Sequence, residues 1–272
     1  MNFIAHNILL DNGQKTMGNN PFLIAKNSWW KAAHKTINLF IPDGDKNKMR
    51  VVDLGCLEGG YTVELARLGF QTLGIEAREE NIQKCNYVKQ HLTLPNLNFV
   101  KDDVRNLTKY GTFDITFCYG LLYHLDDPAA FLKTIGNNTT KLLLLHTHFA
   151  LENDLLYELS TVNRFFAPLQ KRIKFLNYRR NYKLSKLTIN EGYKGRWYQE
   201  WNKNDNIENI EKNLEASYNN PKSFWPTKKE LTKALHNAGF DSVFEQFDFT
   251  GDTTPENYTE YNQRTMFVAV KH

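Results

Sequence analysis

The chain has 272 residues, of which 41% are hydrophobic and 24% are charged, and its formal net charge is +4 at pH 7. This length suffices for one substantial core without requiring two independent domains, and the hydrophobic content indicates a globular protein. The mild basic excess neither demands nor excludes a polyanionic partner.

The cysteine spacing argues against a cysteine metal site, and the first residues argue against a secretory signal peptide. Cys56, Cys85 and Cys118 are odd in number and show no metal-ligand spacing, and Cys56 and Cys118 lie in apolar, strand-like surroundings typical of inert core thiols. The chain starts without a basic and apolar signal pattern. No apolar stretch approaches the roughly 20 residues that a membrane helix needs. We therefore expect a cytoplasmic protein with no membrane partner.

Residues 1–48 are polar and rich in asparagine. A helix is predicted to begin at Trp29-Trp30 and to continue through Ile37 and Phe40. We expect an N-terminal helical lid over a ligand site. The alternative is a helix that simply packs on a sheet.

Residues 51–60 read VVDLGCLEGG, a β-branched run followed by an acid and glycines. Val51 and Val52 suit a buried parallel strand, and the glycines allow a sharp turn to which a ligand can come close. From Tyr61 to Leu68 the apolar residues follow a helical spacing. Strand, glycine turn and helix together are typical of a nucleotide-like ligand site.

A second apolar run, Gln71–Ile75, ends in Glu76, about 20 residues after the glycine turn. A carboxylate at this place can accept hydrogen bonds from both ribose hydroxyls of a nucleotide. The alternative for Glu76 is an exposed acid near the start of a helix.

Three more strands are expected at Asn98–Val100, Phe113–Tyr119 and Leu142–Leu145. Each is followed by polar or glycine residues: Asp102-Asp103 after the first, Gly120 after the second, and His146-Thr-His148 after the third. Asp126-Asp127-Pro128 is predicted to cap a helix that runs over Ala129–Ile135.

Residues 150–222 separate the fifth strand from the return to the core, and we expect them to govern substrate choice. Between Arg164 and Lys186, eight basic residues are mixed with five aromatic ones. This pattern fits a solvated helix face, a pocket for a phosphorylated or nucleotide-linked molecule, or RNA contacts.

The stretch Lys194–Trp201 reads KGRWYQEW. Arg196 is predicted to grip a carboxylate or phosphate, while Trp197 and Trp201 supply flat apolar walls to a substrate pocket. Trp225, in the segment Ser223–Pro226, is a further predicted substrate residue. The alternative is that Arg196 bridges to Glu200 across a helical turn and that the tryptophans belong to the core.

The C-terminal part returns to a regular pattern. A helix is predicted from Thr227, with Thr227 and Glu230 as a capping box and Gly239 as its end. Two strand-like runs follow, Ser242–Phe249 and Thr265–Val270, and an antiparallel pair at a sheet edge is expected.

Four stretches, VVDLGCLEGGYTVELA, LGIEA, KDDV and FDITFCYGLLYHLDDPAAFL, stand in an order and spacing that resemble the class I S-adenosylmethionine-dependent methyltransferases. The resemblance covers about residues 50–150. It implies a Rossmann-like α/β fold: a mostly parallel seven-stranded sheet with an antiparallel C-terminal hairpin, plus N-terminal and inserted helical cap elements. A nicotinamide dehydrogenase is the rival, but Gly55-x-x-x-Gly59 does not fit G-x-G-x-x-G.

The resemblance implies S-adenosylmethionine as cofactor and assigns its contacts by position. The turn would wrap the methionine part, Glu76 would hold the ribose, Asp103 would face the adenine amino group, and Tyr119 and Gly120 would border the sulfonium. The implied cofactor residues are Asp53, Gly55, Leu57, Gly59, Tyr61, Glu76, Ala77, Asp103, Val104, Tyr119 and Gly120. Leu57 departs from the family pattern, in which many members carry glycine.

A hydroxyl acceptor calls for a base that titrates near neutrality, and histidine is the natural choice. His124, His146 and His148 follow the fourth and fifth strands, at the edge where parallel sheets bind ligands. At least one is expected to act on the acceptor; the alternative for each is a structural role. Asp126 and Asp127 with His146 and His148 could hold a metal, but we expect none.

We expect O-methylation of a small polar acceptor that is sugar-like, nucleotide-linked or phosphorylated. The alternatives are a methyltransferase acting on a wobble-position uridine of tRNA, which the segment GLLYHL also resembles, and a non-catalytic cofactor-binding protein. A homodimer is compatible with the sequence. The expected organisation is a lid (1–48), a cofactor-binding core (49–150), an inserted cap (151–222) and a C-terminal return to the sheet (223–272).

Overall fold

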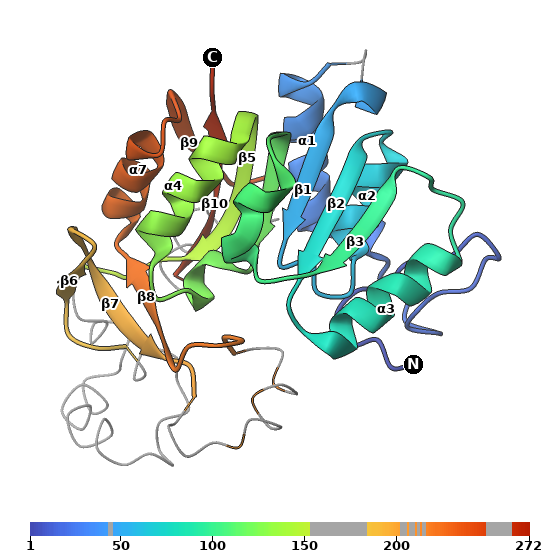
Figure 1. The fold of residues 1–272 in the computed structure, drawn as a ribbon, viewed down its shortest axis with the longest axis horizontal. Coiled ribbons are helices and arrows are strands. Elements are labelled where there is room, and N and C mark those ends of the chain that lie inside the picture. The colour runs from blue at the N-terminus through green and yellow to red at the C-terminus, as the bar shows by residue number, and fades with distance from the viewer. Residues whose placement is uncertain are drawn as a thin grey trace.

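A computed structural model of the chain describes residues 1–42, 46–152, 184–201, 206, 210, 213, 216–248 and 263–272. Its centre is a seven-stranded sheet with the order β3-β2-β1-β4-β5-β10-β9 (Figure 1). The strands are β1 Arg50–Leu54, β2 Gln71–Glu76, β3 Leu97–Lys101, β4 Phe113–Tyr119, β5 Thr139–His148, β9 Ser242–Gln246 and β10 Arg264–Val270.

The pairing confirms the predicted sheet. Strands β1 to β5 run parallel, whereas β10 is antiparallel to both of its neighbours, β5 and β9. The chain moves outward from β1 through β2 to β3, and then crosses back to β4 on the other side of β1. Ligands of such sheets bind beyond the carboxyl ends of the strands at this reversal.

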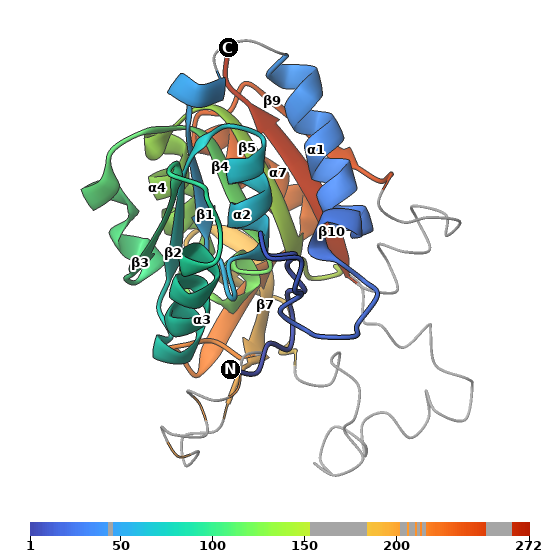
Figure 2. The ribbon, with the colours of Figure 1, turned by 90° about the vertical axis from the view of Figure 1, so that its right-hand side faces the viewer.

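Helices cover both faces of the sheet (Figures 1 and 2). Side chains of α1 Ser28–Phe40, α2 Gly60–Arg67 and α3 Glu79–Gln90 contribute to one buried cluster. Those of the 3-10 helix η3 Val104–Tyr110, α4 Pro128–Asn138 and α7 Lys228–Asn237 contribute to the other. Val51 faces the first cluster and Val52 the second, as the alternation of a doubly covered strand requires.

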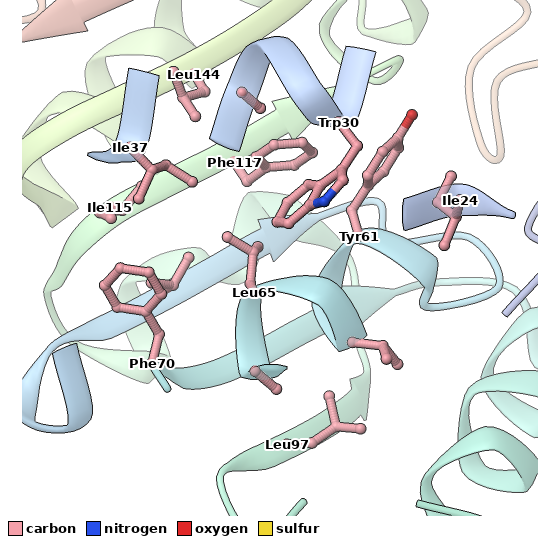
Figure 3. Close-up of a cluster of buried hydrophobic side chains, with 14 of the residues drawn as sticks. Ile24, Trp30, Ile37, Tyr61, Leu65, Phe70, Leu97, Ile115, Phe117 and Leu144 are labelled. Atoms are coloured by element: carbon pink, nitrogen blue, oxygen red, sulfur yellow. The ribbon is translucent and has the colours of Figure 1, made fainter. Parts of the chain in front are cut away.

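Aromatic side chains fill the first cluster near the start of α2. Tyr61 lies 5.1 Å from Phe117 between ring centroids and 6.4 Å from Trp30 (Figure 3). Burying such rings contributes roughly 1.5–3 kcal/mol each. The start of α2 is therefore fixed against both the sheet and α1.

The N-terminal segment lies over the turn that follows β1. The fully buried carboxylate of Glu58 accepts hydrogen bonds from the backbone N–H groups of Ile4 (2.9 Å), Ala5 (3.0 Å) and His6 (2.8 Å). It also pairs with the buried ammonium of Lys84 at 3.1 Å. The buried face of α1 packs on the sheet, as the second of the two alternatives expected. The role of residues 1–48 as a lid stays a prediction.

A second, three-stranded sheet lies beyond the carboxyl ends of the parallel strands (Figure 1). Its strands are β6 Thr188–Asn190, β7 Tyr193–Gln199 and β8 Lys222–Pro226. The chain from Arg196 to Gln199 is thus a strand. The alternative that Arg196 bridges to Glu200 across a helical turn is therefore wrong. Strand β8 belongs to this small sheet, and the return to the large sheet begins with α7.

The start of α4 differs from the prediction. Asp127 occupies the N-cap position but its side chain makes no capping hydrogen bond. Instead, the carboxylate of Glu191, in the turn between β6 and β7, accepts the N–H groups of Ala129 (3.0 Å) and Ala130 (2.7 Å). The small sheet is thereby attached to the core through a helix end.

Candidate active site

A cavity of about 500 Å³ opens at the carboxyl ends of β1, β2, β4 and β5. The small sheet and α1 close its other sides with Tyr198, Trp225 and Trp29. Most of the residues predicted to bind the cofactor line it, namely Asp53, Gly55, Leu57, Tyr61, Glu76, Ala77, Asp103, Val104, Tyr119 and Gly120. All three predicted histidines and Trp225 line it as well. Gly59, Arg196 and Trp197 are not among its described lining residues.

The turn after β1 is a backbone cradle. Gly59 has φ of +80°, and a Cβ there would lie 2.7 Å from the Phe99 ring, so only glycine fits. Leu57 also has positive φ, 53°, which explains why glycine is common at the place where this chain departs from the family pattern. The Leu57 N–H donates to the Glu76 carboxylate at 2.9 Å and so fixes the turn to β2.

Two buried carboxyl groups face the cavity beside this turn. Burial raises the pKa of Asp53 to about 7, although a hydrogen bond from the Thr62 hydroxyl at 2.6 Å opposes the shift. Burial also raises the pKa of Glu76, which is 6% exposed and accepts the N–H of Arg78 at 2.8 Å. A ligand that offers hydrogen-bond donors or positive charge would therefore stabilise the ionised form of both carboxyl groups.

Asn81 was not anticipated from the sequence. It is fully buried on α3 and lines the cavity. A hydrogen bond from its side chain to Glu76 opposes the rise in the pKa of that carboxyl, so the two residues lie side by side in the cavity wall.

Asp103 lies at the end predicted for adenine. One carboxylate oxygen accepts the Arg105 N–H at 2.9 Å and the other accepts the Asn219 amide at 3.0 Å. Arg105 also pairs with Asp126 at 2.7 Å and with Asp127 at 3.4 Å. The two aspartates are therefore engaged by a cation, and the described residues contain no group of three or more potential metal ligands.

Aromatic rings border the place predicted for the sulfonium. Tyr119 stacks at 3.9 Å on Phe117 and lies 5.8 Å from Tyr61. Faces of electron-rich rings attract cations. Gly120 follows with φ of +81°, and its N–H donates to the carbonyl of His146 at 2.9 Å, which joins the ends of β4 and β5.

The three histidines have different surroundings. His124 faces the carboxylate of Glu200, with Nδ1 3.1 Å and 3.2 Å from its two oxygens. That carboxylate is 1% exposed and is held by the Ser223 hydroxyl (2.6 Å) and the Ser217 N–H (3.0 Å). Glu200 was not anticipated as a site residue.

His148 and His146 both lie in β5. The Nδ1 of His148 donates to the carbonyl of Gln263 at 2.9 Å, and its ring stacks on Trp225 at 4.7 Å. His146 is fully buried between Trp29 and Tyr119. Burial, with the nearby positive charge of Arg264 and the His148 ring, holds the pKa of His146 well below its usual value.

Arg196 serves the small sheet. Its guanidinium donates to the backbone carbonyls of Leu151 (3.0 Å), Ser185 (3.0 Å) and Glu152 (3.3 Å). Trp197 packs edge-on against Phe224. Their predicted substrate role has no geometric support, because these donors bind main chain and these rings pack away from the cavity. Most of the basic and aromatic segment Arg164–Lys186 lies outside the described residues.

The residues that the sequence analysis missed include Trp29, Asn81, Tyr123 and Arg264, which line the cavity, and Glu200, which supports His124. Trp29 and Tyr123 stood beside features that the sequence did single out, a helix start and His124. Glu200 and Arg264 carry no local signal, since each reaches the site only through the fold.

Comparison with known proteins agrees with this geometry. Residues 45–239 match a family model described as a methyltransferase domain. The fold resembles the N-terminal domain of EvdMO1, solved in the presence of SAH and D-fucose, with a TM-score of 0.64 and 21% identity over 98% of this chain and 91% of that one. It also resembles magnesium protoporphyrin IX methyltransferase from Synechocystis PCC 6803 with bound SAM, with a TM-score of 0.52 and 14% identity over 94% and 87%.

Two curated relatives match shorter parts. A tRNA U34 carboxymethyltransferase from Campylobacter hominis is 32% identical over 123 residues, 43% of this chain and 42% of the relative. A ubiquinone biosynthesis O-methyltransferase from Colwellia psychrerythraea is 30% identical over 87 residues, 31% and 35% of the two chains. The chain thus matches less than half the length of each.

The cavity suits the cofactor, because the buried carboxyl groups of Asp53 and Glu76 and the buried amide of Asn81 line it beside the turn after β1. No helix among the described residues is long and apolar enough to cross a bilayer. The chain belongs to the methyltransferase domain family.

Proposed function

We propose that the protein transfers a methyl group to a hydroxyl of a small polar acceptor, with His124 as the general base and Glu200 as the residue that positions it. The observation that carries the proposal is the contact between His124 Nδ1 and the buried Glu200 carboxylate at the wall of the cavity. The acceptor class is the one expected from the sequence: sugar-like, nucleotide-linked or phosphorylated.

The contact determines which nitrogen carries the proton. With Nδ1 against a carboxylate, Nδ1 is protonated and Nε2 keeps its lone pair. When bound, S-adenosylmethionine supplies an electrophilic methyl group. The leaving group of the transfer would be S-adenosylhomocysteine. Nε2 of His124 would accept the proton of the acceptor hydroxyl, and Glu200 would stabilise the resulting imidazolium.

The other two histidines are less suited to this role. His148 donates to a neutral carbonyl, which stabilises an imidazolium less than a carboxylate does. His146 has a pKa held well below its usual value, so it stays neutral and is a weak base near pH 7. Both line the cavity and can contribute to its shape and polarity.

The small-molecule assignment rests on the cavity and on relatives. A volume of about 500 Å³ is in the usual range for small-molecule sites and must hold cofactor and acceptor together. One structural neighbour was solved in the presence of D-fucose, and one relative is an O-methyltransferase. The tRNA alternative is supported by the relative named for tRNA U34.

The first test replaces His124 by Asn. Turnover of an acceptor found by cofactor-consumption screening should fall about 10²- to 10⁴-fold, because general-base assistance typically contributes that much. Calorimetric affinity for S-adenosylhomocysteine should stay within about twofold.

Three comparisons make this test specific. His236→Asn, on α7 and away from the cavity, is the matched control and should keep full activity. Glu200→Gln should move the acidic limb of the pH profile to lower pH, since it weakens the stabilisation of the imidazolium. Full activity in the His124 variant would refute the base assignment, and retention of bulk tRNA with a steep salt dependence would favour the tRNA alternative.

A further inference from the structure

Arg264 is the first residue of β10 and pairs in register with His148 on β5. Its guanidinium lines the cavity between two rings, 5.1 Å from the centroid of Trp29 and 5.3 Å from that of Tyr123. Its Nε is buried without a hydrogen-bond partner. The guanidinium forms neither an ion pair nor a hydrogen bond with the described residues.

Two other arginines that line the cavity are engaged. Arg78 donates to two backbone carbonyl groups, each at 2.9 Å, and Arg105 is held by aspartates. A guanidinium has five donors and stays charged at any physiological pH. Leaving such a group unpaired in a cavity is costly, so Arg264 is a candidate for direct ligand binding.

The surroundings of Gly120 show where this cation points. A Cβ at Gly120 would lie 3.6 Å from Nη2 of Arg264 and 3.7 Å from the hydroxyl of Tyr123. The two donors therefore converge beside the residue predicted to border the sulfonium. The Tyr123 hydroxyl likewise has no hydrogen-bond partner in the part of the chain that the structure describes.

Charge is unevenly distributed around the cavity. Its acidic lining residues, Asp53, Glu76 and Asp103, all lie on the side predicted for the cofactor. The opposite wall carries rings, histidines and one permanent cation, and its described lining residues are Trp29, Tyr123, His124, His146, His148, Tyr198, Trp225 and Arg264. An anion placed on that wall would meet no carboxylate at the surface.

We propose that Arg264 and Tyr123 bind an anionic group, a carboxylate or a phosphate, that the acceptor carries near its reacting hydroxyl. The inference rests on the proposed function and narrows its substrate class. The guanidinium donates two parallel hydrogen bonds to the anion, Tyr123 donates a third, and the rings of Trp29 and Tyr123 hold the guanidinium plane. The neighbouring His124 then faces the hydroxyl of the same molecule.

One experiment uses acceptor pairs that differ only in the anion, such as a sugar and its phosphate ester, or a hydroxy acid and its amide. The wild-type enzyme should methylate the anionic member with the higher kcat/KM. In Arg264→Gln this preference should fall about 10- to 100-fold, mainly through KM, because hydrogen bonds to charged groups contribute that much. Arg264→Lys should restore part of it, and Tyr123→Phe should lower it less.

A second experiment needs no known acceptor. Inorganic phosphate is titrated calorimetrically into the wild-type protein saturated with S-adenosylhomocysteine. We expect millimolar binding that weakens at least tenfold in Arg264→Gln. Lys35→Gln, which removes the same charge from an exposed site on α1, is the control and should bind phosphate like the wild type.

The outcomes separate the two proposals. Turnover of neutral and anionic acceptors at equal efficiency, or phosphate binding that is absent or insensitive to Arg264→Gln, overturns the anion site and leaves methyl transfer intact. Weakened S-adenosylhomocysteine binding in Arg264→Gln also overturns it, since the anion would then be the cofactor's own carboxylate. Arg264-dependent phosphate binding without turnover of any hydroxyl acceptor supports the anion site and argues against O-methylation.

Discussion

At the scale of single residues, the cavity combines buried acids with buried donors. The carboxylate of Glu76 accepts hydrogen bonds from two backbone N–H groups and faces the space predicted for ribose. Asn81 lies in the same wall, and a hydrogen bond from its side chain to Glu76 opposes the rise in the pKa of that carboxyl. Ribose hydroxyls can donate to the carboxylate and accept from the amide, so the two side chains form a complementary pair for a diol.

Replacing Glu76 by Ala should weaken S-adenosylhomocysteine binding roughly 30- to 150-fold, because hydrogen bonds to a charged group contribute about 2–3 kcal/mol. Calorimetry measures the affinity, and circular dichroism checks that the fold is retained. Glu79→Ala, an exposed acid on the neighbouring α3, is the matched control and should bind normally. Unchanged affinity in the Glu76 variant would remove the ribose assignment.

At the scale of elements, local signals succeeded where the partner was near in sequence. Half of the predicted capping box forms at the start of α7: the Glu230 N–H donates to the Thr227 hydroxyl, whereas the Thr227 N–H donates to the carbonyl of Lys194. At α4 the sequence suggested Asp127, but the cap is Glu191, more than 60 residues away along the chain. A cap supplied by another element leaves no pattern in the helix that it caps.

Glu191→Ala should therefore destabilise the protein by about 1 kcal/mol, the usual loss on removing a helix N-cap, and lower the thermal midpoint by a few degrees. Asp127→Ala tests the cap expected from the sequence and should cost less, because that side chain makes no capping hydrogen bond. Thermal unfolding of both variants decides between them. Greater loss in the Asp127 variant would contradict the structure.

At the scale of the whole molecule, the sequence was informative about one half of the site. The sheet, its parallel strands and its antiparallel C-terminal pair were predicted and are confirmed, because each strand and turn has a compact signal and the resemblance supplied the order. The predicted cofactor residues come from short loops after β1, β2, β3 and β4. The opposite wall of the cavity instead gathers Trp29, Tyr198 and Arg264 from distant elements, and only folding brings these together.

The site also affects stability as a function of pH. Asp53 has a folded-state pKa raised to about 7, against about 3.8 unfolded, so the folded state holds the extra proton between these values. The free energy of unfolding should fall as pH rises from 4 to 7 and then level off. The titration of Asp53 should contribute up to about 4 kcal/mol to this fall.

Asp53→Asn should remove this contribution and be relatively more stable than the wild type at pH 8, as measured by urea unfolding at several pH values. Thr62→Val, which removes the hydroxyl that donates to Asp53, should steepen the wild-type dependence. Parallel wild-type and Asp53→Asn curves across this range would contradict the assigned pKa.

The attachment of the N-terminal segment to Glu58 uses main-chain N–H groups of Ile4, Ala5 and His6. Main-chain donors are the same for every residue type except proline. Evolution can therefore vary the side chains at positions 4 and 5 widely while the carboxylate at position 58 stays under selection. Homologous sequences should diverge along this segment yet keep an acid at the turn, with proline excluded from positions 4 to 6.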